Sequence, residues 1–149
     1  MRNFPPERII CLTEETVETL YLLGEQDRIV GVTGYAVRPP IVRKEKERVA
    51  AFTSAKIDKI LSLQPDLILA FSDLQADIAA ELIKSGVAVM TYNQRDISGI
   101  LAMIRHLGAI VGVGDKAEEL ASSYEKRLNH IRTKKKNIYR PRVYFEEWD

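Results

Sequence analysis

Polar and aromatic side chains follow four short aliphatic runs in this chain of 149 residues, at the points where the runs end. The four groups are Thr13-Glu14-Glu15 after "RIICL", Thr33-Gly34-Tyr35 after "DRIVGV", Phe71-Ser72-Asp73 after "DLILA", and Tyr92-Asn93-Gln94 after "VAVMT". Aromatic faces bury a large ligand area at low entropic cost, and a few polar groups fix a ligand's orientation. These residue types favour the binding of a flat, apolar ligand over bond-making chemistry.

The sequence offers no arrangement typical of a catalytic or metal centre. His106 and His130 lie in two expected helices, where a surface histidine is the usual case, and neither stands near the end of an expected strand. No HExxH or CxxC motif occurs, and "GVGD" (112–115) follows a helix, so it indicates a turn and not a phosphate-binding loop. Because no nucleophile, base and orienting group converge, we do not expect an enzyme.

Composition narrows the class of protein further. Hydrophobic residues make up 46% of the chain and charged residues 29%, as in an ordinary globular domain, and the net charge of +1 gives no general attraction to nucleic acid. The single cysteine, Cys11, lies in an apolar run, so we expect a buried, unreactive thiol. No window reaches the ~18 apolar residues of a membrane span, and no secretory leader is visible. We therefore expect either a cytoplasmic protein or one whose leader lies outside this sequence.

Strand and helix patterns alternate along the chain. Expected strands cover 7–13, 27–34, 66–71 and 87–92, and expected helices cover 13–24, 53–64, 72–86 and 96–112. The stretch 35–49 is polar and contains two prolines, so it is expected to be a loop. This alternation predicts an α/β fold, a parallel sheet of about four strands flanked by helices in a Rossmann-like lobe. Pro65-Asp66 would close the amino end of one strand, and Phe71 to Asp73 would lie at its open carboxyl end, where ligands bind in such sheets.

The last third of the chain departs from this alternation. No glycine or proline interrupts Asp115 to Lys136, and apolar residues form a one-sided stripe along it, which predicts one long helix. "RPRVYFEEWD" then predicts a strand at Val143–Phe145 with no evident partner. We expect a lobe at 1–112, a connecting helix at 113–138, and the first strand of a second, truncated lobe at 139–149. The unpartnered strand also suggests a homodimer formed by edge pairing.

Several of the candidate binding residues have a simpler explanation. Tyr35, with Pro39 and Pro40, forms either a wall for a ligand or an ordinary surface loop. Glu14 and Glu15 are also the acidic residues that a helix N-terminus favours. Phe71 could simply be the last core residue of its strand.

The order of these segments resembles a known family. "RIICLTEETVETLYLLGEQDRIVGVTGY", "PP", "IDKILSLQPDLILAF" and "LIKSGVAVMTYN" are similar, in this order, to the N-terminal lobe of the metal-chelate class of ABC-transporter substrate-binding proteins. This class takes up cobalamin, ferric siderophores and haem. "KILSLQPDLILA" is the most specific piece, and "VYFEEW" is more similar to the cobalamin-binding branch than to the siderophore branch. The resemblance covers nearly the whole chain but half of a complete family member.

The resemblance implies a site and a partner. The ligand, cobalamin or a ferric chelate, would lie in a cleft between two lobes joined by the long helix, and the protein would hold no cofactor or metal of its own. The ligand-binding positions would be Thr13, Glu14, Glu15, Tyr35, Phe52, Phe71 and Ser72. Asp73, Asp77 or Glu81 would dock onto arginines of a membrane permease. The family also implies a periplasmic or otherwise extracytoplasmic location.

The sequence thus favours the substrate-binding component of an ABC importer, with cobalamin as the first ligand to test. An alternative is a cytoplasmic chelate carrier or sensor built on the same lobe. A third hypothesis, an enzyme that modifies nucleotides or chelates, requires a glycine-rich phosphate loop after a strand, and the sequence has none.

Overall fold

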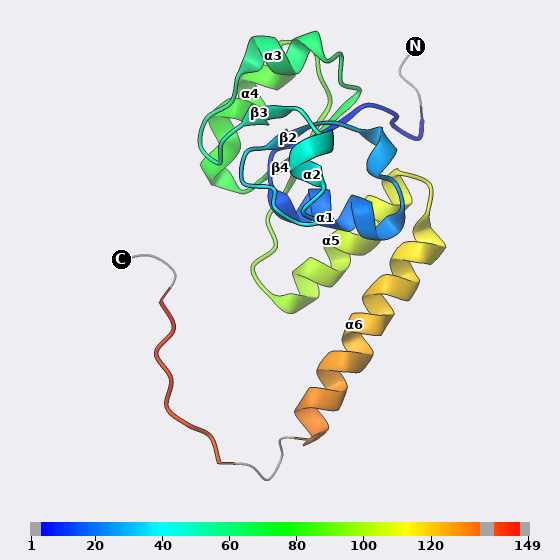
Figure 1. Ribbon diagram of the computed structural model, residues 1–149, viewed down its shortest axis with the longest axis vertical. Helices are drawn as coiled ribbons and strands as arrows, with labels where there is room; N and C mark the ends of the chain where they lie inside the picture. Colours follow the sequence, from blue (N-terminus) through cyan, green and yellow to red (C-terminus); the bar gives the residue numbers. More distant parts are fainter. Residues whose placement is uncertain (1–3, 135–138, 147–149) are drawn as a thin grey trace.

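A computed structural model of the chain, which describes residues 4–134 and 139–146, contains one five-stranded sheet. The strands are β1 (Ile9–Cys11), β2 (Ile29–Thr33), β3 (Arg48–Ala50), β4 (Leu67–Phe71) and β5 (Val89–Tyr92). They lie in the order β3-β2-β1-β4-β5, and every neighbouring pair is parallel (Figure 1). The predicted α/β fold with a parallel sheet is confirmed.

The strand β3 corrects the prediction of about four strands, because it lies in the stretch that was expected to be a loop. Charged residues surround it in the sequence, and of its three residues only Val49 is fully buried. A three-residue strand at the edge of a sheet pairs with one neighbour and can form with a single buried side chain. No apolar run in the sequence therefore marks its position. The short helix α2 (Val42–Glu45) lies in the same stretch and was also missed.

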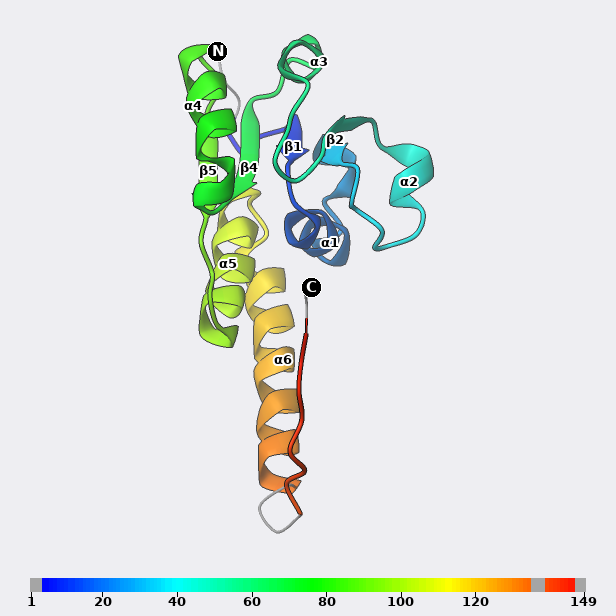
Figure 2. The same cartoon turned by 90° about the vertical axis from the view of Figure 1, so that its left-hand side faces the viewer.

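Helices cover both faces of the sheet. One face packs against α1 (Glu14–Leu23) and α5 (Ile97–Ile110), and the other against α3 (Ile57–Ser62) and α4 (Ala76–Lys84) (Figure 2). The long helix α6 (Gly114–Lys134) packs on α5 and α1 and adds Ala117 and Ala121 to the first core. Successive residues of β1 alternate between these layers: Ile9 and Cys11 join the first core, and Ile10 joins the second. Two short 3-10 helices, η1 (Gln26–Arg28) and η2 (Asp73–Gln75), complete the lobe. None of the helices in the described residues combines the length and apolar character needed to cross a bilayer.

Cys11 is fully buried in the first core, as expected. Burial raises the pKa of its thiol to about 12. The thiol therefore stays protonated at neutral pH, which disfavours a nucleophilic role.

The amino ends of the central strands are tied together by Asp66. Its carboxylate accepts hydrogen bonds from the backbone N–H groups of Glu7 (2.7 Å) and Arg8 (3.0 Å). The Arg8 guanidinium in turn donates to the carbonyl oxygen of Leu63 at 2.6 Å. The turn at Pro65-Asp66 thus closes the amino end of β4 against β1, as the sequence indicated.

The helix α6 packs against α5 at its start and then extends beyond the rest of the lobe (Figures 1 and 2). The predicted helix is confirmed as far as Lys134, and its last two predicted residues lie outside the described part of the chain.

The strand predicted at Val143–Phe145 is wrong for this structure. Residues 139–146 form neither helix nor strand, and the side chains of Val143, Tyr144 and Phe145 are more than four-fifths exposed. A β-strand is stable only when a neighbouring strand pairs with it, and no described residue pairs with these three. The homodimer that this strand suggested remains a prediction.

Candidate ligand-binding site

The carboxyl ends of the five strands lie along one edge of the sheet, which we call the rim: residues 12–15, 33–35, 51–54, 71–73 and 92–95. The chain continues from β1 to β2 on one side, whereas β4 lies on the other side of β1. The helices that follow β1 and β4 therefore cover opposite faces of the sheet, and the strand order switches between these two strand ends. In parallel sheets this switch in strand order is where ligands bind.

All seven sequence-predicted binding residues lie at the rim, and they come from four strand ends: Thr13, Glu14, Glu15, Tyr35, Phe52, Phe71 and Ser72. Glu14 is exposed and Glu15 is half-buried, and the other five differ in exposure. Tyr35 is 57% exposed and Phe52 and Phe71 are half-buried, so all three aromatic rings offer surface to a ligand. The side chains of Thr13 and Ser72 are buried, so they support the rim from beneath.

Gln75 joins three of the rim segments, and no pattern in the sequence indicated this role. Its side-chain oxygen accepts a hydrogen bond from the Phe71 N–H at 3.0 Å. Its side-chain nitrogen donates to the carbonyl oxygens of Leu12 (3.2 Å) and Phe52 (2.8 Å). The side chain is fully buried, so one amide fixes the ends of β1, β3 and β4 relative to one another.

The turn after β4 is held in an uncommon conformation. Ser72 has a φ of 57°, in the left-handed region that few residues other than glycine adopt. Its N–H donates to the carbonyl oxygen of Tyr92 at 2.7 Å, and its hydroxyl accepts from the Leu74 N–H at 3.3 Å. These bonds fix the direction in which Phe71 leaves the sheet, and such strain is common at functional sites.

Two residues after β5 complete the rim, and they were not among the predicted binding residues. The side-chain amide of Gln94 donates to the Glu15 carboxylate at 3.2 Å, which connects β5 to the start of α1. The Arg95 guanidinium lies 5.6 Å from the centroid of the Phe71 ring and 3.4 Å from a carboxylate oxygen of Asp73. A cation over an aromatic face is attracted to the ring, so Arg95 orients Phe71 from the solvent side.

Three buried polar atoms at the rim have no hydrogen-bond partner among the described residues: Thr13 Oγ1, Tyr92 OH and Gln94 Oε1. Burial raises the pKa of the Tyr92 phenol to about 12, so this group is a neutral donor at physiological pH. Buried polar groups without partners are uncommon in proteins, and each one calls for an explanation. Here all three lie on the edge where the topology places a ligand.

The rim has the chemistry of a binding surface. Across residues 4–134 and 139–146, no group of three or more His, Cys, Asp or Glu side chains is arranged to hold a metal ion. His106 and His130 are exposed on α5 and α6, away from the strand ends, as the sequence indicated.

The predicted permease-docking carboxylates begin at the rim and continue along the helix that follows it. Asp73 is in η2, and Asp77 and Glu81 are one helical turn apart on α4. All three are exposed, which a docking role requires but does not establish.

A Rossmann-like lobe with an aromatic and polar rim at its switch point is typical of solute-binding proteins of the periplasmic type. Comparison with known sequences gives the same class of protein. The profile described as "Periplasmic binding protein" matches residues 9–149, and the chain belongs to this family. Members of this family bind solutes and are not enzymes.

Two curated relatives and one solved structure illustrate the similarity. The chain is 33% identical over 137 residues to an uncharacterized ABC transporter substrate-binding lipoprotein, YvrC, of Bacillus subtilis strain 168. It is 35% identical over 136 residues to the vitamin B12-binding protein of Vibrio cholerae serotype O1. The crystal structure of the periplasmic vitamin B12 binding protein BtuF of Vibrio cholerae superposes with a TM-score of 0.80 at 31% identity, covering 89% of this chain and 52% of that one.

These matches cover unequal shares of the two proteins. Each of the two curated matches covers 89% of this chain but only 43% of YvrC and 48% of the vitamin B12-binding protein. The chain therefore spans about half the length of the curated relatives it matches.

Proposed function

We propose that this chain is the N-terminal, ligand-binding lobe of the substrate-binding component of an ABC importer for a metal chelate, with cobalamin as its ligand. The observation that carries the proposal is the convergence of Tyr35, Phe52 and Phe71, from three different strand ends, on the carboxyl edge of one sheet. A corrin ring is large and partly apolar, and aromatic faces of this kind bury such a surface at low entropic cost.

The charges at the rim favour cobalamin over the other chelates of the class. Glu14 and Glu15 stand after β1, and the cation Arg95 is paired with Asp73. Haem carries two carboxylates and many ferric siderophores are anionic, so both would meet an excess of negative charge. Cobalamin presents neutral amides around its ring, which carboxylates and the Gln94 amide can bind through hydrogen bonds. The vitamin B12-binding relative from Vibrio cholerae supports the same choice.

Transport requires a membrane partner. We expect Asp73, Asp77 and Glu81 to meet cations of a permease, with the protein located outside the cytoplasmic membrane. A cytoplasmic chelate carrier or sensor would use the same rim without this contact. Cell fractionation separates the two, because a carrier or sensor would be recovered with the cytoplasm.

Calorimetric titration of the protein tests the ligand. Cyanocobalamin, haemin and a ferric siderophore are titrated into the protein extended to the length of its relatives, since one lobe supplies only half of the cleft. We expect cyanocobalamin to bind most tightly, and Tyr35→Ala and Phe71→Ala each to weaken binding by about tenfold or more, as for central aromatic anchors. Ile83→Ala, an exposed residue on α4, is the control and should leave affinity unchanged. If none of the three ligands binds, the proposal is wrong.

A further inference from the structure

The Glu15 carboxylate is held at the rim by a hydrogen bond from a distant part of the chain. Glu15 lies in the first turn of α1, where the partial positive charge of the helix end stabilises a carboxylate in its charged form. Its Oε1 accepts a hydrogen bond from the side-chain nitrogen of Gln94 at 3.2 Å. Its Oε2 accepts none from any described residue, so a hydrogen-bond donor on a ligand can still bind there.

Gln94 is itself fixed by close packing against α5. A Cβ atom added at Gly99, in the first turn of that helix, would lie 3.0 Å from the Cβ of Gln94 and 3.2 Å from its Cα. The Gly99 N–H donates at 2.6 Å to the carboxylate of Asp96, the residue that caps the helix. Because Gly99 has no side chain, the start of α5 lies directly against Gln94, which restricts the directions that the Gln94 side chain can take.

The orientation of the Gln94 amide is set by Glu15. Gln94 Oε1 is buried and has no hydrogen-bond partner among the described residues, which is unfavourable for a carbonyl oxygen. Turning the amide over would place this oxygen against the negative carboxylate, which is less favourable still. Gln94 therefore supplies a donor to Glu15 although its own acceptor stays without a partner.

Two buried hydroxyl groups accompany this hydrogen bond. Thr13 lies two residues before Glu15, and Tyr92 lies two residues before Gln94. Both are more than nine-tenths buried, and Thr13 Oγ1 and Tyr92 OH have no hydrogen-bond partner among the described residues. Polar atoms without partners thus lie on both segments that the hydrogen bond joins. Such a concentration is uncommon in a core that serves stability alone and indicates a binding region.

The negative charge of Glu15 is not neutralised within the lobe. Arg95 follows Gln94 in the sequence, but its guanidinium pairs with Asp73 and lies over the Phe71 ring. In the part of the chain that the structure describes, no lysine or arginine forms an ion pair with Glu15. Like charges repel strongly in a partly buried site, because water screens them poorly there. A carboxylate of a ligand would be rejected at Glu15, whereas a neutral amide N–H would be accepted.

We propose that Glu15 is the residue that selects neutral chelates bearing N–H donors over anionic chelates, and that Gln94 is the positioning residue that holds its carboxylate at the rim. The inference rests on the proposed binding function and adds to it the group that rejects negative charge. An amide and a carboxylate have nearly the same size, so this selection depends on one contact and not on the shape of the whole ligand.

Paired ligands test the selection. Cyanocobalamin and its monocarboxylic acids, in each of which one side-chain amide has been hydrolysed to a carboxylate, are titrated calorimetrically into the protein extended to the length of its relatives. We expect at least one acid to bind about tenfold or more weakly than cyanocobalamin, and this difference to fall to about threefold or less in Glu15→Gln. Glu18→Gln removes the same charge one helical turn along α1, so it is the control and should keep the difference.

A double-mutant cycle tests the role of Gln94. Gln94→Leu should reduce the preference for cyanocobalamin over that acid by about threefold or more, because the Glu15 carboxylate is no longer held in place. In the Glu15→Gln protein the same substitution should have no further effect on the preference. A residue that merely supports the fold would weaken the binding of both ligands alike in both backgrounds.

Several results would overturn the inference. Equal affinity for cyanocobalamin and all of its acids, or a preference that survives in Glu15→Gln, would contradict the selection by Glu15. Independent effects of the two substitutions would contradict the positioning role of Gln94. If cyanocobalamin does not bind at all, the proposed ligand is wrong, and the nuclear magnetic resonance signals of the Gln94 side-chain amide decide the inference without a ligand. These signals should move in Glu15→Gln and stay in place in Glu18→Gln, and signals unchanged in both variants would overturn it.

Discussion

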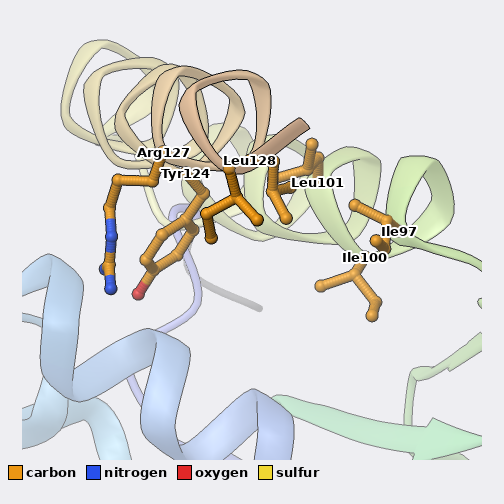
Figure 3. Close-up of a pocket in the computed structure, with 7 residues that line it drawn as sticks. Ile97, Ile100, Leu101, Tyr124, Arg127 and Leu128 are labelled. Carbon is orange, nitrogen blue, oxygen red and sulfur yellow. The ribbon is translucent and has the colours of Figure 1, made fainter. Parts of the chain in front are cut away.

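The amino and carboxyl ends of the sheet differ in how completely their side chains are partnered. At the amino end, Asp66 binds two backbone N–H groups, and Gly108 of α5 packs directly on Ala117 of α6. At the carboxyl end, Thr13 Oγ1 and Tyr92 OH are buried with no hydrogen-bond partner among the described residues. An apolar groove between α5 and α6, lined by Ile97, Ile100, Leu101, Tyr124, Arg127, Leu128 and Ile131, also lies toward this end (Figure 3).

This difference separates an edge whose groups are partnered within the lobe from an edge whose groups are open to another molecule. Polar groups without partners and exposed apolar side chains are unfavourable in an isolated domain. The buried polar atoms without partners and the apolar groove both lie toward the carboxyl edge, where ligands bind in parallel sheets. The amino end is thus closed by contacts within the lobe, whereas the rim leaves polar and apolar groups open to another molecule.

Replacing Gln75 should have the largest effect on stability. Gln75→Leu removes the partners of the Leu12 and Phe52 carbonyls and of the Phe71 N–H, and each buried group left unpaired is unfavourable. We expect a loss of about 2–4 kcal/mol in the free energy of unfolding, measured by urea denaturation. The half-buried Gln94 donates one side-chain hydrogen bond, to Glu15, so Gln94→Leu should lose about 1 kcal/mol or less. Equal losses for the two variants would contradict the central role of Gln75.

A side chain added where α5 and α6 touch should have the next largest effect on the free energy of unfolding. A methyl group added at Gly108 would overlap the Ala117 side chain, so the helices must separate in Gly108→Ala. Alanine favours helices over glycine by up to about 1 kcal/mol, yet we expect a net loss of about 1–3 kcal/mol from overpacking. The matched control is Gly114→Ala, where the added methyl group meets open space. A stabilised Gly108→Ala protein would show that the two helices are not in close contact.

The ion pair on the outer side of the same helices should make stability depend on pH. Arg105 donates to both Glu118 and Glu125, and the pKa of Glu118 is lowered to about 2, chiefly by its hydrogen bond to Arg105. A carboxylate whose pKa is lowered in the folded state stabilises the fold at pH values above its ordinary pKa of 4.5, and this stabilisation is lost as the pH falls toward 2.

Thermal melts of the Glu118→Gln protein between pH 8 and pH 2 check this expectation. The native protein should melt at a higher temperature than Glu118→Gln above about pH 5, and the gap should close on acidification. Glu119→Gln, at an exposed neighbouring position, should show no such pH-dependent gap. A gap that widens at low pH would reverse the sign and contradict the assignment.

Substitutions in the groove between α5 and α6 should have the smallest effect on the free energy of unfolding of this chain. Ile131 is 53% exposed on the part of α6 that leaves the lobe, so Ile131→Asp removes little buried surface. We expect a change of about 0.5 kcal/mol or less in the free energy of unfolding. A loss as large as that of Gly108→Ala would mean that α5 and α6 are in close contact as far as Ile131.

The strands that consist of aliphatic runs could be predicted from the sequence. Features that depend on contacts between residues far apart in the sequence could not. The strands β1, β2, β4 and β5 were found because most of their residues are apolar, whereas β3 has one fully buried residue and left no pattern. Gln75 binds residues that are 63 and 23 positions away in the sequence, and no spacing rule reveals such a contact. Phe52 was found only through the family resemblance, because it follows the strand that was missed.

The candidate site itself followed from topology. Once the strands are parallel, Thr13, Tyr35 and Phe71 must lie on one edge, and the structure places them there. The binding role of these side chains remains a prediction. Gln94 was expected at a strand end, but its hydrogen bond to Glu15 and the contact of Arg95 with Phe71 became evident only in the structure.

The most direct test of the central claim is chemical-shift mapping of the isotope-labelled, full-length protein titrated with cyanocobalamin. We expect the backbone amides of Glu15, Tyr35 and Phe71 to shift with saturating ligand, while the amides around Asp66 at the opposite end of the sheet stay in place. Shifts centred on Asp66, or none at the rim when ligand is bound, would contradict the account.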